Sequence, residues 1–188
     1  MDGDLPEGGT DRTLNRMVAI TVVILSVFMG ISKVKDDNIV QAMQQAKADA
    51  VDHWSEYQAV RTKLHVAETA RAEIGLIAQG AGMASQAAPI LARLDADIVK
   101  YQAKAPAVQG EAKADEAKYD ALNVHDDQFD MSDALLAIAL SLAAVAALTD
   151  LRWLLYTAWV PAAFGLLMGI AGFLGWSIHP DAIANLLS

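Results

Sequence analysis

The chain has 188 residues, of which 54% are hydrophobic and only 6% are aromatic, a composition more apolar than that of an ordinary soluble domain. Its 14 Lys and Arg residues stand against 23 Asp and Glu residues, for a formal net charge of -9. This acidity argues against nucleic-acid binding, which needs a cationic surface facing the phosphates. Because the chain has no cysteine, disulfide scaffolds, thiolate metal sites and cysteine nucleophiles are excluded.

Three apolar segments are separated by one long polar region. Met17–Ile31 and Ala134–Thr149 contain no charged residue, and Leu151–Ile178 contains only Arg152. A helix that crosses a bilayer needs about 20 mainly apolar residues. We therefore expect all three segments to span a membrane, the first of them extended as far as Val34.

The polar region between the first and second apolar segments has the pattern of two long helices. From Ile39 to Ala78, mostly apolar residues recur at steps of four and three, which is a heptad pattern. Glycines at positions 80 and 82 mark the natural point of reversal. If the turn centres near Ala81, Lys47 is expected to lie near Asp115. Pro106 is expected to bend or break the return helix, with a third short helix folded there as the alternative.

These patterns predict an all-α membrane protein with one N-terminal transmembrane helix, a long antiparallel helical hairpin outside the bilayer, and a C-terminal transmembrane helical hairpin. The predicted parts are an acidic N-terminal tail (1–13), transmembrane helix 1 (14–34), a coiled-coil hairpin (35–133, turn at 80–82), transmembrane helix 2 (134–150), transmembrane helix 3 (151–178) and a C-terminal tail (179–188).

Small residues form two stripes in the closing pair of apolar segments. Ala139, Ala143 and Ala147 recur every fourth residue, and Gly165, Gly169 and Gly172 form a matching stripe. Such stripes let helix backbones approach closely in a membrane. We assign the alanine face to packing within the C-terminal hairpin and the glycine face to a partner.

An acidic cluster precedes the second apolar segment. Asp126, Asp130 and Asp133 share one helical face by their spacing, and their carboxylates are candidate ligands for Mg²⁺ or Ca²⁺. Solvated charge beside the membrane is the competing interpretation. His53 and His65 are interpreted as hydrogen-bonded residues of a packed helix face rather than metal ligands.

Several stretches resemble the bacterial membrane proteins of domain of unknown function family 4337. The residues that carry the likeness are those at 15–20, 31–39, 41–48 and 52–59, and the order of one membrane helix, a charged helical region and a closing membrane pair is similar too. The resemblance implies a bacterial inner-membrane protein with no established reaction, ligand or site residues. Within it, His53, Trp54, Tyr57 and Gln58 are candidate interaction residues, because such groups on an alanine-rich helix have no obvious packing role.

No catalytic motif or cofactor-binding motif is present, so we expect a protein that is not an enzyme and has no cofactor. The heptads predict a membrane-anchored scaffold or accessory subunit that forms a homo-oligomer or joins a larger membrane complex through its hairpin and its Gly and Ala faces. The alternatives are a small oligomeric channel and a metal-binding membrane protein.

The basic residues near the spans bear on orientation. Arg12, Arg16 and Arg152 on one side outnumber Lys33 and Lys35 on the other side, which favours a periplasmic hairpin.

Overall fold

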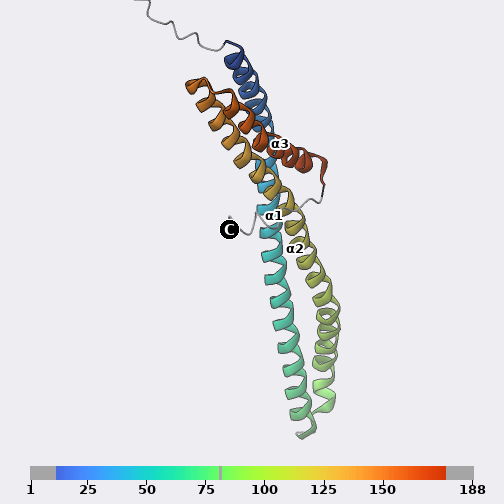
Figure 1. Cartoon of the computed structure of the whole chain (residues 1–188). Coiled ribbons are helices and arrows are strands. Elements are labelled where there is room, and N and C mark those ends of the chain that lie inside the picture. The colour runs from blue at the N-terminus through green and yellow to red at the C-terminus, as the bar shows by residue number, and fades with distance from the viewer. Residues whose placement is uncertain (1–11, 81, 177–188) are drawn as a thin grey trace, which may run out of the picture. The chain divides into compact units, whose positions relative to one another are not determined.

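The structure is a computed structural model that describes residues 12–80 and 82–176. It contains three α-helices, α1 (Arg12–Gly80), α2 (Ala84–Thr149) and α3 (Arg152–Leu174), drawn in Figure 1. The prediction of an all-helical fold is confirmed for these residues, and each helix holds a stretch long and apolar enough to cross a membrane. The predicted C-terminal tail and nearly all of the N-terminal tail lie outside the described residues.

The chain divides into two compact units. We call residues 42–120 the arm, and we call the described residues of the other unit, 12–41 and 121–176, the membrane unit. Each unit has its own buried side chains, and each is described separately below.

The arm consists of the second part of α1 and the first part of α2, which run antiparallel (Figure 1). The reversal uses Gly82, whose φ of 66° lies in the left-handed region that glycine enters without strain. The amide of Met83 then donates to the carbonyl oxygen of Ala78 at 3.0 Å. The predicted heptad positions of α1 are largely buried in the arm: Met43, Ala46, Ala50, Val60, Leu64, Ala67 and Ala78.

Two expectations for the arm differ from the structure. Of those at Pro106, the break and the alternative of a third short helix are wrong, since α2 runs through Pro106. Proline removes the donor for the carbonyl of Gln102, but both residues are exposed, so water can take the place of that donor. The register also differs, because Asp115 contacts His53 instead of Lys47. Since α2 begins only at Ala84, the turn centres beyond the predicted position.

The membrane unit packs all three helices together. One buried cluster comprises Leu14, Val18, Ala143, Ala146, Leu155 and Ala158, and a second comprises Leu25, Leu136, Ala139 and Ala162. α2 and α3 are joined by Asp150 and Leu151 alone, with Asp150 in the left-handed region at a φ of 53°. Gly175 ends α3 with a φ of 67°, short of the predicted boundary at 178.

Candidate functional site

Four buried polar side chains of the membrane unit lie in sequence at or near the ends of the predicted spans 14–34 and 134–150. Ser32 and Asp36 come from α1, and Gln128 and Ser132 come from α2, with exposed fractions of 0–3%. Each pair is separated by four residues, so both members lie on one face of their helix. We call these four residues the polar layer. Burial of polar groups costs free energy unless they find hydrogen-bond partners, so their bonding decides what the layer can do.

Part of the polar layer is satisfied by neighbouring groups. Lys33 Nζ donates to Asp36 Oδ2 at 2.7 Å, and Gln128 Nε2 donates to the carbonyl oxygen of Trp176 at 2.7 Å. His125 Nδ1 lies 3.2 Å from Gln128 Oε1. The bond to Trp176 therefore attaches the end of α3 to α2, whereas the Lys33–Asp36 bond lies within α1.

Other atoms of the same region have no partner in the structure. They are Ser32 Oγ, Asp36 Oδ1, Ser132 Oγ and Asp133 Oδ1. Buried polar atoms are hydrogen-bonded in the great majority of cases, and an exception calls for a functional or chemical reason. Carboxylate oxygens only accept, whereas a hydroxyl both donates and accepts. The layer therefore offers oxygen acceptors that a proton or a cation would satisfy.

The acidic face of α2 adjoins the polar layer. Burial, with the charges of Asp130 and Asp36, raises the pKa of Asp126 to about 6. Burial also raises the pKa of Asp130 and of Asp133 above the usual value of 3.8. Among the described residues, however, no group of three or more His, Asp or Glu side chains converges enough to hold a metal ion. Asp126, Asp130 and Asp133, the candidate metal ligands, therefore do not belong to such a group in the described part of the chain.

Sequence reasoning missed the polar layer. Ser32 and Asp36 follow directly from the first apolar segment at a spacing of four, and Gln128 and Ser132 precede the second with the same spacing. Two polar pairs that continue the buried face of apolar helices are the signal that could have revealed the layer. We instead treated Lys33 and the aspartates as solvated charge beside the membrane.

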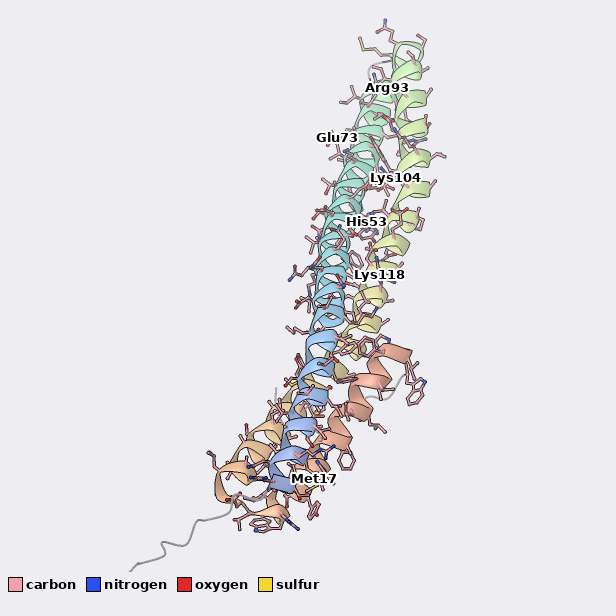
Figure 2. The ribbon with its side chains drawn as sticks, turned by 90° about the horizontal axis from the view of Figure 1, so that it is seen from above. Met17, His53, Glu73, Arg93, Lys104 and Lys118 are labelled. Atoms are coloured by element: carbon pink, nitrogen blue, oxygen red, sulfur yellow. The ribbon has the colours of Figure 1, made fainter. Side chains whose placement is uncertain are left out.

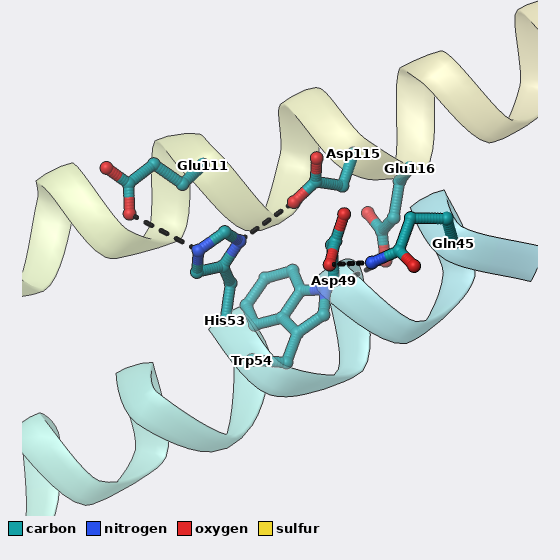
Figure 3. Close-up of polar contacts among 7 residues, drawn as sticks. All are labelled: Gln45, Asp49, His53, Trp54, Glu111, Asp115 and Glu116. Atoms are coloured by element: carbon teal, nitrogen blue, oxygen red, sulfur yellow. Dashed lines mark hydrogen bonds and ion pairs between the residues drawn. The ribbon is translucent and has the colours of Figure 1, made fainter. Parts of the chain in front are cut away.

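His53 belongs to a second polar cluster, located in the arm. Its Nδ1 atom lies 2.8 Å from Asp115 Oδ2, and its Nε2 atom lies 3.7 Å from Glu111 Oε2 (Figure 3). The hydrogen bond to Asp115 raises the pKa of His53, and the charges of Asp115 and Glu111 act in the same direction. His53 therefore joins α1 to α2 within the chain, which agrees with its interpretation as a hydrogen-bonded residue of a helix face.

The other predicted interaction residues near His53 are Trp54, Tyr57 and Gln58, and only some of them contact other side chains of the arm. Trp54 Nε1 donates to Glu116 Oε1 at 2.8 Å, and the Trp54 ring meets Tyr57 edge-on with centroids 5.6 Å apart. Gln58 is exposed. Trp54 therefore contributes to pairing inside the arm, and only Gln58 of this group faces solvent outright.

Ion pairs join α1 and α2 further along the arm. Lys104 Nζ lies 2.5 Å from Glu56 Oε1, and Arg71 pairs with Asp95. Figure 2 shows His53 on α1 and Lys104 on α2 where the two helices of the arm lie side by side. All these partners are partly exposed, so the pairs fix register more than they stabilise the fold.

The glycine stripe packs inside the membrane unit, which corrects its assignment to a partner. A Cβ atom on Gly165 would lie 2.9 Å from Leu136 Cγ, one on Gly169 would lie 2.6 Å from Phe28 Cε1, and one on Gly172 would lie 2.9 Å from the Phe129 ring. Ala139 and Ala143 are also fully buried. Both small-residue faces are used within the chain, because three helices rather than two meet here.

Comparison with known proteins identifies one family. The model of the family described as "Domain of unknown function (DUF4337)" matches residues 14–175. Neither the curated proteins nor the solved structures gave a match.

Proposed function

Because the chain belongs to the DUF4337 family, whose description assigns no activity, we propose a role from the geometry: a non-enzymatic, membrane-anchored scaffold or accessory subunit. Its arm assembles with a second copy of the chain. One observation carries this proposal, an apolar surface at the turn of the arm. It consists of Leu76, Ile77, Met83 and Ile90, which are 71%, 66%, 50% and 50% exposed. We call these four residues the tip patch.

The tip patch borders a shallow groove between the end of α1 and the start of α2. The groove has a volume of about 200 Å³, and its lining includes Ile77, Met83 and Ile90 together with the buried Ala78 and Ala87. A single exposed apolar side chain is ordinary, but a contiguous group of them marks an interaction surface. The patch lies far in sequence from all three predicted spans, so the bilayer is not expected to cover it.

The thin core of the arm also supports assembly. Alanines fill many of its buried positions, among them Ala46, Ala50, Ala67 and Ala112. Alanine buries little area, and apolar burial contributes only about 25 cal/mol per Å². Further apolar area would be covered if another chain packed against the arm.

A second copy is the occupant that we assign to the tip patch. Copies anchored in one membrane by the same spans carry the same patch in the same orientation, and a two-fold axis lets such a patch pair with itself. The Gly and Ala faces are already packed within the chain, which leaves the arm as the surface for assembly.

The oligomeric state in mild detergent tests the proposal. We expect the wild-type chain to be a dimer by light scattering, and Leu76→Gln combined with Ile77→Gln to shift it to monomer, since glutamine keeps helix propensity while removing apolar surface. Gln79→Glu, which adds a charge at an exposed position of the same turn, is the matched control and keeps the dimer. A wild-type chain that purifies alone as a monomer would overturn the proposal, as would capture of a different membrane protein in place of a second copy.

Membrane placement completes the proposal. We assign the spans 14–34, 134–150 and 151–178 to the bacterial inner membrane with the arm in the periplasm, on the balance of Arg and Lys between the two sides. Lys63 is exposed in the arm, and the chain has no cysteine, so Lys63→Cys is a unique label. A membrane-impermeant maleimide should modify it in spheroplasts. Labelling only after lysis would place the arm in the cytoplasm.

A further inference from the structure

We propose that the membrane unit binds one proton between Asp36 of α1 and Asp126 of α2, and that this proton holds the two helices together at the polar layer. The ligand is a proton, and the site is a pair of carboxyl groups, one on each of the two helices. This inference is independent of the proposed assembly through the arm.

Asp36 provides the first half of the site. Its side chain is 3% exposed, Oδ2 accepts from Lys33, and Oδ1 has no partner in the structure. A buried acceptor without a donor carries a desolvation penalty that a hydrogen bond removes. The unbonded oxygen therefore marks a place where a donor is needed.

Asp126 provides the second half. Its side chain lies within hydrogen-bonding reach of Asp36, and burial, Asp130 and Asp36 together raise the pKa of Asp126 to about 6. Two ionised carboxylates cannot bond to each other, because both only accept. If Asp126 carries a proton, it becomes a donor to Asp36, and the like-charge repulsion across the helices disappears. A single proton thus gives Asp36 its missing donor and removes the repulsion between the two carboxylates.

The surrounding charges are predominantly negative. On α1, Lys33 is already bound to Asp36 and to Asp37, at 2.7 and 3.4 Å. The acidic groups of α2 near the site are Asp127, Asp130 and Asp133, and His125 contacts Gln128. Between Trp153 and Leu174, α3 has no Asp, Glu, Lys, Arg or His. The region therefore has more carboxylates than cations.

A proton fits the site better than a metal ion does. The described residues include no group of three or more His, Asp or Glu side chains that could hold a metal. A metal of the Mg²⁺ or Ca²⁺ type needs six or more oxygen ligands around one point. A proton needs only one donor oxygen and one acceptor oxygen, the roles that we assign to Asp126 and Asp36.

The pH dependence follows from the raised pKa of Asp126. Its ordinary value is 3.8 and its value in the fold is about 6. The folded state therefore binds the proton more tightly than the unfolded state. The stabilisation is complete below about pH 3.8 and is lost as the pH rises through about 6. Contact between α1 and α2 at the polar layer is tighter in mildly acidic conditions than at pH 7–8.

Infrared difference spectroscopy of the full chain in mild detergent tests the site directly. We expect a protonated carboxyl C=O band that titrates with a midpoint near pH 6 and disappears in Asp126→Asn. In Asp36→Asn the band should remain but titrate at lower pH, because the charge of Asp36 is one of the causes of the shift. Asp37→Asn, next in sequence and 59% exposed, is the matched control and leaves the midpoint unchanged.

Three outcomes would overturn the proposal. One is a wild-type chain with no carboxyl titration between about pH 5 and 7. Another is a band that persists in Asp126→Asn, which would place the proton elsewhere. The third is a rise in the unfolding midpoint at pH 8 with sodium chloride but not with choline chloride at equal ionic strength, because a metal cation would then occupy the site. If Asp126→Asn fails to fold, the shifted midpoint in Asp36→Asn still decides the question.

Discussion

Phe129 and Gly172 touch so closely that no side chain fits between them. A Cβ atom on Gly172 would lie 2.9 Å from both Cε2 and Cζ of the Phe129 ring. The ring is 1% exposed and meets Phe173 edge-on with centroids 5.2 Å apart. It therefore has little freedom to move aside. α3 presents bare backbone to the largest fully buried side chain of α2.

Gly172→Ala is expected to destabilise the membrane unit by about 1–3 kcal/mol, the usual cost of overpacking a filled core. The effect should appear as a lower thermal-unfolding midpoint in mild detergent, followed by circular dichroism. Gly30→Ala is the matched control, because Gly30 lies in α1 of the same unit and a Cβ there meets nothing within 4 Å. An equal loss in both variants would show that helix backbone effects, rather than the Phe129 contact, cause it.

The link between α2 and α3 gives a second prediction. Asp150 adopts a left-handed backbone with a φ of 53°, which glycine enters freely and β-branched residues resist. Asp150→Val should therefore be less stable than Asp150→Gly, by about 1–2 kcal/mol. Chemical denaturation of the two variants side by side measures this difference. Equal stability would mean that the link relaxes to another conformation.

The third prediction concerns pH and the arm. Because the bond to Asp115 raises the pKa of His53 above 6.5, the arm stabilises the imidazolium form. This contribution is fully present below pH 6.5 and is lost as the pH rises through the higher value in the fold. NMR titration of the His53 ring should show the raised midpoint, and Asp115→Asn should lower it.

Glu116→Gln is the control for the His53 titration. Glu116 is adjacent in sequence but accepts a hydrogen bond from Trp54, not from His53. The His53 midpoint should change less in Glu116→Gln than in Asp115→Asn. Equal shifts in the two variants would mean that the general acidity of the helix face, rather than one hydrogen bond, sets the pKa of His53.

The alanine core of the arm gives the fourth prediction. Ala112 is fully buried, so Ala112→Leu should force α1 and α2 apart and cost about 1–3 kcal/mol. Ala117→Leu, at an exposed position of the same helix, should change the stability by less than about 0.5 kcal/mol. Thermal unfolding of both variants provides the comparison. If Ala112→Leu were as stable as Ala117→Leu, the core of the arm would be loosely packed at Ala112.

The periodicity of the sequence predicted most of the helical architecture. The steps of four and three placed Met43, Val60 and Leu64 at the core of the arm, because burial of one helix face imposes that period on any two packed helices. Gly82 lies in the turn, as predicted, whereas Gly80 is the last residue of α1. The break considered at Pro106 does not occur, since the cost of a proline depends on whether water reaches the freed carbonyl, and exposure cannot be read from a single residue.

The contacts between segments were less predictable. The register of α1 against α2 depends on where the turn centres, and a small error there moved Asp115 from Lys47 to His53. The glycine stripe was recognised as a close-packing face, but sequence alone did not reveal that Leu136, Phe28 and Phe129 would cover it. The polar layer was missed because its members are ordinary residues until three helices bury them together.

The hydrogen bond from Gln128 to Trp176 has a practical consequence for topology mapping. It fixes the end of α3 beside the part of α2 that directly follows the arm in sequence. If all three helices cross a bilayer, the start of the arm-side part of α2 and the chain after α3 emerge on the same face of the membrane, opposite to Arg12. A fluorescent or enzymatic reporter joined to the chain after α3 would then read out the compartment that contains the arm, while a reporter ahead of α1 would read out the other.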